Sequence, residues 1–543
     1  MKKIFYLFPL FLVFFTISLI AQTPAKYWVQ FKDKTGSSYS IDRPQEFLSA
    51  KAIENRNRQH IKITEEDLPV NQHYIAQVAT LDDSMIVLTK SKWLNGITVY
   101  SNKEDIIEKI KQLPFVIFCE RTISMKEPEI PIDSVYSFYS DAKPVYSKEG
   151  NWDESFYGEA LEQLKLNNIH WLHRLGFRGE KMVMMVMDGG FHNVDTLRHF
   201  AKMREDNRLL GARNFVLLGE NPFREASHGT MVLSCIASYV PGELVGSAPF
   251  VAAYVAKTED GRSENKIEED NWVAGIEWAD SLGCQVLNSS LGYTKFDDSL
   301  QTRTYEDLNG KTSRNSAGNE GTKKWKYIGA PADAEQILSV GAVDINGKRA
   351  SFSSYGPTAD GRIKPDACAV GKNTFVATPR SKTLKSNGTS FSSPILSGMV
   401  VCLWQAFPEK SNLEIIDAIR KSGSQIMAPD SSLGYGITDF LRAYNYLNLK
   451  ENVKNLADFQ SFVSHNGKTN IAITTETPTP LTITAKSRKS GKITTKTYDI
   501  SVKKIINFTL PKLPKNTAYD IIDLTISTPT QSQNYIVGAE QTK

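Results

Sequence analysis

The chain has 543 residues, of which 41% are hydrophobic and 23% are charged. At roughly 150 residues per domain, this length suggests three or four domains, and the composition excludes a disordered chain or a multi-span membrane protein. The 64 Lys and Arg against 60 Asp and Glu leave a net charge of only +4, which gives no electrostatic case for a nucleic-acid binder or a polybasic membrane surface. The function must therefore rest on specific polar sites.

Residues 1–21 have the pattern of an export signal. Lys2 and Lys3 precede an uncharged apolar run from Ile4 to Ile20, which ends before the polar Thr23. We predict a cleaved signal peptide and a secreted or cell-surface protein, with an uncleaved anchor as the alternative because the run is long for a signal. We expect no other membrane contact, since no other segment is apolar enough to span.

Residues 23–123 alternate strand-like and amphipathic helical patterns, which predict a small α+β domain. The expected strands are Tyr27–Phe31, Tyr74–Ala79, Met85–Leu88, Ile97–Tyr100 and Val116–Cys119, and the expected helices lie near Gln45–Gln59 and at Lys103–Gln112. Residues 124–150 contain three prolines and no sustained periodicity, which indicates a linker.

Residues 151–449 alternate apolar runs with helical patterns, which predicts an α/β domain with buried parallel strands and crossover helices. We expect strands at Met182–Met187, Val251–Val255 and Val286–Leu287, and a helix at Glu268–Leu282. Residues 450–543 alternate Thr, Ser, Lys and Ile, as in Asn470–Ile473 and Leu481–Thr484, with Pro478 and Pro480 between these runs. This pattern predicts an all-β carboxyl-terminal domain.

Five cysteines are scattered along the chain without a CxxC pair. Their odd number leaves at least one thiol free, although two disulfides would suit an oxidising compartment. The apolar surroundings of Cys235, Cys284 and Cys402 favour small buried side chains instead.

Two polar residues follow or open apolar segments of the α/β region. Asp188 ends the run Lys181–Met187, and carboxyl ends of buried strands are where open α/β sheets keep their sites. His228 opens an apolar helical stretch with Gly229 beside it. Taken singly, Asp188 fits an ordinary turn residue and His228 a capping or core histidine.

Two further segments suit nucleophilic chemistry. Ser390 follows Gly388 at the start of an apolar helix, where the helix dipole favours negative charge. Asn319 lies in a turn of small residues and can donate a hydrogen bond to an oxyanion. Taken singly, these segments fit a Ser/Thr helix cap and a common turn. Together the four residues supply nucleophile, base, orienting acid and oxyanion donor.

The segments around these residues resemble the signatures of subtilisin-like serine proteases (subtilases, peptidase family S8). The matching segments are Asp188-Gly-Gly190, His228-Gly-Thr230, Ala317-Gly-Asn319 and Gly388-Thr-Ser-Phe-Ser-Ser-Pro394, in the family's order of Asp, His and Ser. Shorter matches include Asn288–Gly292, Phe352–Pro357 and Gly434–Gly436, so the resemblance covers about 151–449. A lipase is disfavoured because no Gly-x-Ser-x-Gly motif surrounds Ser390.

The resemblance implies a three-layer α/β fold with a mostly parallel sheet and a secreted endopeptidase that hydrolyses polypeptides. It implies that Asp188 orients His228, that His228 deprotonates Ser390 for acyl-enzyme formation, and that Asn319 and the Ser390 N–H hold the oxyanion. The residues implied to bind the substrate backbone are Ser290, Leu291, Gly292, Ala317 and Gly318. No cofactor is expected: calcium often stabilises such enzymes, but the sequence offers no assignable ligands and we assign no metal site.

The resemblance also implies roles for the flanking regions. The amino-terminal domain has the size and position of a propeptide that assists folding and then inhibits the cleft, with a permanently attached structural domain as the alternative. The carboxyl-terminal domain resembles a β-sandwich, serving either as a stabilising domain or as a surface-sorting domain.

One departure from the family keeps a second function open. A helix and an apolar strand should precede the Asn319 turn, but Tyr293 to Ser316 contains few apolar residues and shows neither element. We therefore expect the central sheet to lack a strand there. The alternative to an active endopeptidase is a catalytically impaired, protease-like binding protein.

Overall fold

The computed structural model describes most of the chain. The described residues are 25–103, 105–124, 137–140, 142–146, 150–217, 219–294, 296–297, 318–449, 456–459, 461–465, 467–474, 479–500 and 503–541. The predicted signal, most of the predicted linker, Ala317 and nearly all of the segment before Asn319 therefore lie outside them.

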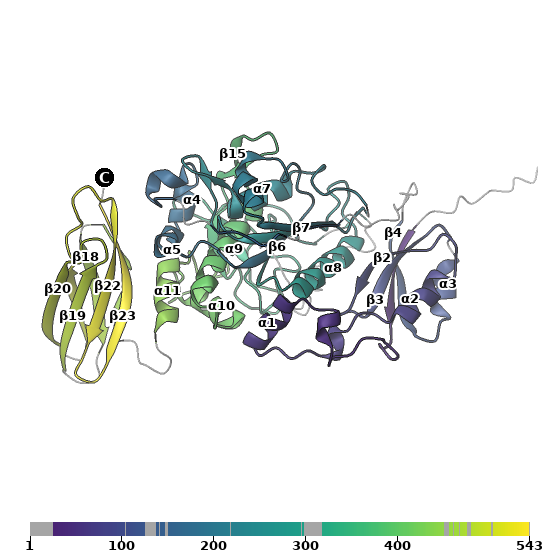
Figure 1. The fold of residues 1–543 in the computed structure, drawn as a ribbon, viewed down its shortest axis with the longest axis horizontal. Coiled ribbons are helices and arrows are strands. Elements are labelled where there is room, and N and C mark those ends of the chain that lie inside the picture. The colour runs from purple at the N-terminus through teal and green to yellow at the C-terminus, as the bar shows by residue number, and fades with distance from the viewer. Residues whose placement is uncertain are drawn as a thin grey trace, which may run out of the picture.

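The amino-terminal part, purple in Figure 1, is a four-stranded antiparallel sheet with three helices. The strands follow the order β2-β3-β1-β4 and are β1 (Ala25–Phe31), β2 (Ile86–Ser91), β3 (Gly96–Ser101) and β4 (Val116–Ser124). The helices are α1 (Ala50–Arg58), α2 (Gln72–Ala79) and α3 (Ile106–Lys111), with 3-10 turns at Pro44–Glu46 and Glu65–Asp67. The part has its own apolar core.

Two predictions in this part were wrong. Residues Tyr74–Ala79 belong to α2 rather than to a strand, because Asn71 caps a helix by accepting from the His73 N–H, and Ile75 and Val78 are buried on one face at a spacing of three. The helix expected from Gln45 begins only at Ala50, after the Ser49 cap.

The middle of the molecule is built on a five-stranded sheet with the order β11-β6-β10-β7-β5. The strands are β5 (Ser137–Tyr139), β6 (Val183–Asp188), β7 (Leu209–Asn214), β10 (Ala252–Lys257) and β11 (Val286–Ser289). All but the antiparallel edge strand β5 run parallel. Met184 and Val186 of β6 enter one core while Met185 and Met187 enter another, so the predicted strand is buried on both faces.

Helices cover both faces of this sheet, which confirms the predicted three-layer α/β architecture (Figure 1). The helices are α4 (Leu161–Lys165), α5 (Ile169–Leu175), α6 (Ala201–Glu205), α7 (His228–Ala237), α8 (Ile267–Leu282), α9 (Thr389–Ala406), α10 (Asn412–Lys421) and α11 (Phe440–Asn448). Two 3-10 turns span Glu154–Tyr157 and Arg198–Phe200, and the smaller strand pairs are β8 (Tyr239–Val240) with β9 (Leu244–Val245), β12 (Val340–Val343) with β13 (Ala367–Val370), and β14 (Thr374–Ala377) with β15 (Thr383–Ser386).

Helix α9 packs against two sheets of the middle part. Within the described part of the chain, β11 is the last strand of the five-stranded sheet, and β12 pairs only with β13. Helix α9 packs against β11, β12 and β13 and so bridges the two sheets. The expected loss of one strand concerns residues that fall mainly outside the described ranges, and it stays a prediction.

The carboxyl-terminal part, yellow in Figure 1, is β-rich as predicted. Its sheets have the orders β16-β18-β21 and β17-β23-β22-β19-β20. The strands are β16 (Ala457–Phe459), β17 (Val463–Ser464), β18 (Lys468–Thr474), β19 (Thr479–Ser487), β20 (Ile493–Ile500), β21 (Lys503–Thr509), β22 (Tyr519–Ser527) and β23 (Ser532–Glu540). Pro480 lies inside β19 rather than before it, at the second residue, where a missing N–H is tolerated.

Buried polar contacts join this part to the middle of the molecule. Glu540 of β23 accepts hydrogen bonds from His170 Nε2 and Arg174 Nη1, each at 3.1 Å, and lies 3.2 Å from Lys165 Nζ. Burial opposes the charged form of Glu540, but His170, Lys165 and Arg174 together hold its pKa well below the usual value. Trp171 of α5 contributes to the core of the β-rich part. The two parts therefore form a continuous packed structure.

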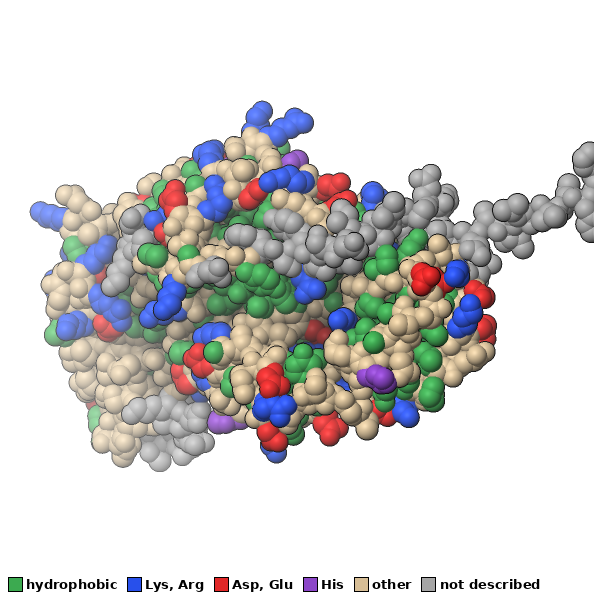
Figure 2. All heavy atoms as spheres, turned by 45° about the vertical axis from the view of Figure 1, so that its right-hand side comes forward, with side chains coloured by type: hydrophobic (Ala, Val, Ile, Leu, Met, Phe, Trp, Pro, Cys, Tyr) green, Lys and Arg blue, Asp and Glu red, His purple; other side chains and the backbone are tan. Residues whose placement is uncertain are grey.

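The five cysteines are all free, and only Cys284 is not fully buried. Burial raises the pKa of Cys119 to about 12, so this thiol is inert at neutral pH. Figure 2 shows basic and acidic side chains interspersed over one face of the molecule. Among the helices described, none is long and apolar enough to cross a membrane.

Candidate active site

Asp188 and His228 meet where β6 ends and α7 begins. Asp188 is the last residue of β6 and is 2% exposed. Its carboxylate accepts a hydrogen bond from the backbone N–H of Gly189 at 2.8 Å. His228 is the first residue of α7, and its Nδ1 lies 2.8 and 3.0 Å from the two carboxylate oxygens of Asp188. A carboxylate accepts only, so Nδ1–H is the donor and Nε2 is left as the basic nitrogen.

The close approach of α7 to β6 requires a glycine after the histidine. A Cβ on Gly229 would lie 2.5 Å from the Gly190 carbonyl oxygen and 2.9 Å from Asp188 Cβ. Any other residue would therefore push His228 away from its carboxylate. The His-Gly pair noted in the sequence thus has a packing explanation.

The charge of Asp188 raises the pKa of His228 above its usual value, although burial acts in the opposite direction. The His228 side chain is still 42% exposed, so a substrate can reach it. A carboxylate that orients an accessible imidazole and stabilises its protonated form is what a general base requires.

Ser390 lies in the first turn of α9, with Gly388 as the N-cap. Its backbone N–H is one of the first helix amides, which have no intrahelical partner. Ser390 Oγ donates to the Ser290 carbonyl at 3.3 Å, and Ser290 Oγ donates to the Ser390 carbonyl at 3.0 Å. Within the part of the chain that is described, the hydroxyl is thus bonded to Ser290 rather than to His228.

Ser390 and His228 are linked through a neighbouring ring. The phenyl ring of Phe391 packs against the imidazole of His228 with the ring centroids 5.8 Å apart. Helices α7 and α9 also pack against each other directly. The nucleophile and base candidates therefore come from the amino-terminal ends of two packed helices.

Asn319 reaches the same end of α9. Its Oδ1 accepts from the Thr389 N–H at 2.9 Å and from Thr389 Oγ1 at 3.0 Å. Because both partners donate, the oxygen of the amide is fixed and the Nδ2 group is its donor end. Asn319 is exposed beside the residue that precedes Ser390, a suitable place for an oxyanion donor.

The predicted substrate-binding residues divide into two groups. Ser290 is fixed by its two hydrogen bonds with Ser390 and by a hydrogen bond from Asn288 Nδ2 at 3.0 Å. Leu291 and Gly292 follow it in the chain. Gly318, at φ 93°, accepts from the Ser354 N–H at 2.9 Å next to Asn319. These four residues flank the start of α9, whereas Ala317 is not among the described residues.

Sequence reasoning missed two supporting residues. Thr389 orients Asn319 through two hydrogen bonds, and Asn288 Oδ1 accepts from Ser393 and Ser397 of α9, each at 3.1 Å. Both residues lie inside the motifs that resemble the family. Their position in the sequence next to the functional residues was the signal that could have identified them. Among the described residues, no three His, Cys, Asp or Glu side chains are grouped as metal ligands.

Comparisons with known proteins identify the family. Residues 182–436 match the model of the Subtilase family, and residues 26–132 match the model described as "Peptidase S8 propeptide domain, Bacteroidota". A thermostable alkaline protease from Halalkalibacterium halodurans is 27% identical over 341 residues, which cover 62% of this chain and 85% of the relative.

A subtilisin from Bacillus pumilus is 29% identical over 270 residues, which cover 49% of this chain and 90% of the relative. The crystal structure of MycP1 with its propeptide removed matches at a TM-score of 0.40 and 20% identity, over 52% of this chain and 96% of that one. The family matches and the named relatives show that this chain is a subtilisin-like serine protease of the subtilase family, with a propeptide domain before its peptidase domain.

Proposed function

We propose that this endopeptidase cleaves peptide bonds through Asp188, His228 and Ser390. The observation that carries the proposal is the pair of hydrogen-bond distances between His228 Nδ1 and the Asp188 carboxylate, which leave Nε2 free to act as the base. His228 takes the proton from Ser390 Oγ while Oγ bonds to the scissile carbonyl carbon. The same proton then passes to the leaving amine, and water repeats the sequence to release the acyl group.

The negative carbonyl oxygen of the intermediate is held by two donors. The Ser390 N–H belongs to the first turn of α9 and the Asn319 amide is oriented by Thr389. Both donors are fixed before the substrate arrives, so their reorganisation costs little during the reaction.

The substrate lies extended along Ser290, Leu291 and Gly292 on one side and Gly318 on the other. Backbone pairing of this kind binds a polypeptide without fixing its sequence. In the precursor, the amino-terminal domain acts as the cleft inhibitor. The signal segment 1–21 directs the protein to the outside of the cell or its surface.

A fluorophosphonate probe tests the nucleophile directly. We expect a covalent adduct on Ser390, located by mass spectrometry of the digested protein, and no adduct on Ser290 or on the Ser390→Ala variant. An unlabelled Ser390 in folded mature protein would instead support the impaired, protease-like binding protein.

Amino-terminal sequencing of the exported protein tests maturation. We expect a new terminus within or near 124–150, because that segment is polar and contains prolines. The Ser390→Ala chain should keep its amino-terminal domain if the cut is autocatalytic. A mature protein that still begins near Thr23 would contradict the propeptide assignment.

A further inference from the structure

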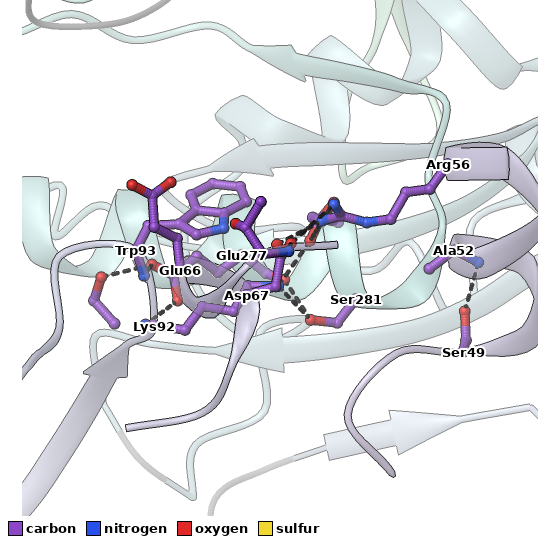
Figure 3. Close-up of polar contacts among 12 residues, drawn as sticks. Ser49, Ala52, Arg56, Glu66, Asp67, Lys92, Trp93, Glu277 and Ser281 are labelled. Atoms are coloured by element: carbon purple, nitrogen blue, oxygen red, sulfur yellow. Dashed lines mark hydrogen bonds and ion pairs between the residues drawn. The ribbon is translucent and has the colours of Figure 1, made fainter. Parts of the chain in front are cut away.

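The amino-terminal domain rests on a polar stripe of α8. Helix α8 lies beside the amino-terminal domain (Figure 1), and the N-cap Lys266 and residues along α8 contact that domain; Figure 3 shows Glu277 and Ser281 among them. The contacts are Lys266 with Glu120, Asp270 with Thr98, Glu277 with Ser91, Lys92 and Trp93, Asp280 with Arg56 and Lys92, and Ser281 with Ser49 and Lys92.

Glu277 holds the turn between β2 and β3 through neutral donors. Its carboxylate accepts from the backbone N–H groups of Lys92 and Trp93 at 2.7 and 3.1 Å, and from Ser91 Oγ. These bonds fix the position of the turn on α8. They do not pair the carboxylate with a cationic side chain.

Asp280 makes a different kind of contact. Arg56 Nη2 lies 2.8 Å from both oxygens of Asp280, and Lys92 Nζ lies 2.7 Å from Oδ2. Arg56 also binds Asp67 of its own domain in a two-pronged contact at 2.8 and 3.2 Å (Figure 3). Arg56, Lys92, Asp67 and Asp280 together form what we call the α8 ion cluster.

The α8 ion cluster is complete only when the two domains are docked. The amino-terminal domain contributes the cations Arg56 and Lys92 and one anion, Asp67, which pairs with Arg56. Asp280 of the peptidase domain supplies the second anion. Arg56 and Lys92 are only 8% and 9% exposed, so loss of Asp280 would leave the buried Lys92 ammonium without its described ion-pair partner.

The cluster is separate from the catalytic geometry. None of its four residues takes part in the hydrogen bonds of Asp188, His228, Ser390 or Asn319. A substitution in the cluster can therefore change how the domain is held without altering the cleft. Buried charge pairs across an interface act mainly on the rate of dissociation.

We propose that the α8 ion cluster is a latch that sets how long the amino-terminal domain stays docked after the linker is cut. This inference rests on the proposed role of that domain as cleft inhibitor. The partner that this surface of α8 fits is the amino-terminal domain, which presents Arg56 and Lys92 to the Asp280 carboxylate.

The test measures release without requiring catalysis. The full-length Ser390→Ala chain receives a recognition site for a specific protease in the predicted linker and is immobilised by its carboxyl terminus. After cutting, the dissociation rate of the amino-terminal domain is followed by surface plasmon resonance. We expect Asp280→Asn to release the domain about tenfold faster or more.

Asp195→Asn is the matched control. Asp195 is 24% exposed against 25% for Asp280 and also binds an arginine with both oxygens, but that arginine, Arg224, belongs to the peptidase domain. This variant should release at the unmodified rate. Added salt should speed release of the unmodified chain more than that of Asp280→Asn, because the variant has lost the ion pairs with Arg56 and Lys92 and keeps only the Lys266–Glu120 pair among the described ion pairs across this interface.

Arg56→Lys tests the latch by changing the partner of Asp280 in the amino-terminal domain. It keeps the charge but loses the two-pronged geometry, and we expect an intermediate release rate. Release of Asp280→Asn at the unmodified rate, or equal acceleration by Asp195→Asn, would overturn the proposal. Because every chain carries Ser390→Ala, these outcomes do not depend on whether Ser390 is the nucleophile, which the fluorophosphonate adduct decides separately.

Discussion

Asp188 and Asp270 are carboxylates of one domain in opposite surroundings. Asp188 is 2% exposed, and its partner His228 comes from the same domain. Asp270 is half-buried beneath the amino-terminal domain, where its one described hydrogen bond is with Thr98 of that domain, at 2.9 Å. The carboxylate of the candidate catalytic pair has its partner within the peptidase domain, whereas Asp270 and Asp280 of the docking surface have side-chain partners in the amino-terminal domain. Removal of the propeptide should thus leave the first intact and change the second.

Ser390→Ala tests the catalytic side of this comparison with the largest expected effect. We expect casein cleavage to fall by about 10⁵-fold or more, since the nucleophile, base and acid act as a unit. The melting temperature should change little, because the hydroxyl makes a single hydrogen bond at 3.3 Å. Cleavage at the unmodified rate would show that Ser390 is not the nucleophile.

The pH dependence of kcat/KM tests the Asp188–His228 pair. The base must be neutral, so activity should fall as pH falls through the His228 pKa, which the charge of Asp188 raises above 6.5. Because folding raises the pKa of His228, the pair contributes its full stabilisation at a pH below the pKa of the unfolded chain. This contribution is lost as pH rises through the pKa of the folded chain. Asp188→Asn should lower activity by about 10⁴-fold. If kcat/KM of the unmodified enzyme fell with an apparent pKa below 6.5, this would contradict the pairing.

Asn319→Asp separates the two ends of one side chain. The substituted carboxylate can still accept from Thr389 but lacks the Nδ2 donor. We expect kcat to fall by about 10²–10³-fold, the range measured for this kind of donor in a subtilisin. Melting should be unchanged, and a lower kcat accompanied by early unfolding would indicate a structural role only.

Asp270→Asn tests the docking side. Burial raises the pKa of Asp270 to about 7 in the docked form, so docking favours the protonated carboxyl. The domain should be held most tightly at acid pH and should loosen as pH rises from the ordinary carboxyl value towards 7. In the release assay described above, we expect about tenfold faster release at neutral than at mildly acid pH. Asp270→Asn should remove this pH dependence. If the release rate of the variant still changes with pH, another titratable group is responsible.

An inserted segment tests the predicted loss of a strand before Asn319 and has the smallest expected effect. An apolar helix and strand placed between Arg314 and Asn315 should supply a partner for β11, which is an edge strand among the described residues. We expect the melting temperature to rise by about 2–4 °C for each kcal/mol gained, and casein cleavage to rise with it. Equal melting and equal rates would show that the existing segment already supports Asn319 adequately.

Much of the fold followed from periodicity alone. The apolar run before Asp188 predicted a strand buried on both faces, and Met184 and Met185 indeed enter different cores. The pattern at Glu268–Leu282 predicted α8 to within one residue. Long periodic segments are predictable because their burial pattern fixes both the element and its face.

Short segments were less predictable. Residues 74–79 are compatible with either a strand or a helix by composition, and the Asn71 cap together with burial of Ile75 and Val78 decided for the helix. The motifs located these residues because Asp188, His228 and Asn319 each lie beside a glycine, and Ser390 opens an apolar helix two residues after Gly388. The roles of these residues stay predictions until the adduct and the variants are measured.

The sequence by itself determined the order of the parts, the family and the residue types at the candidate site, since these depend on local pattern and on motifs read along the chain. Only the tertiary structure showed that Asp280 completes a charge cluster with Arg56 and Lys92, and that Thr389 orients Asn319. The physical reason is separation along the chain. Hydrogen bonds and ion pairs between residues 70 to 224 positions apart leave no periodic signal, because they depend on how complete domains pack.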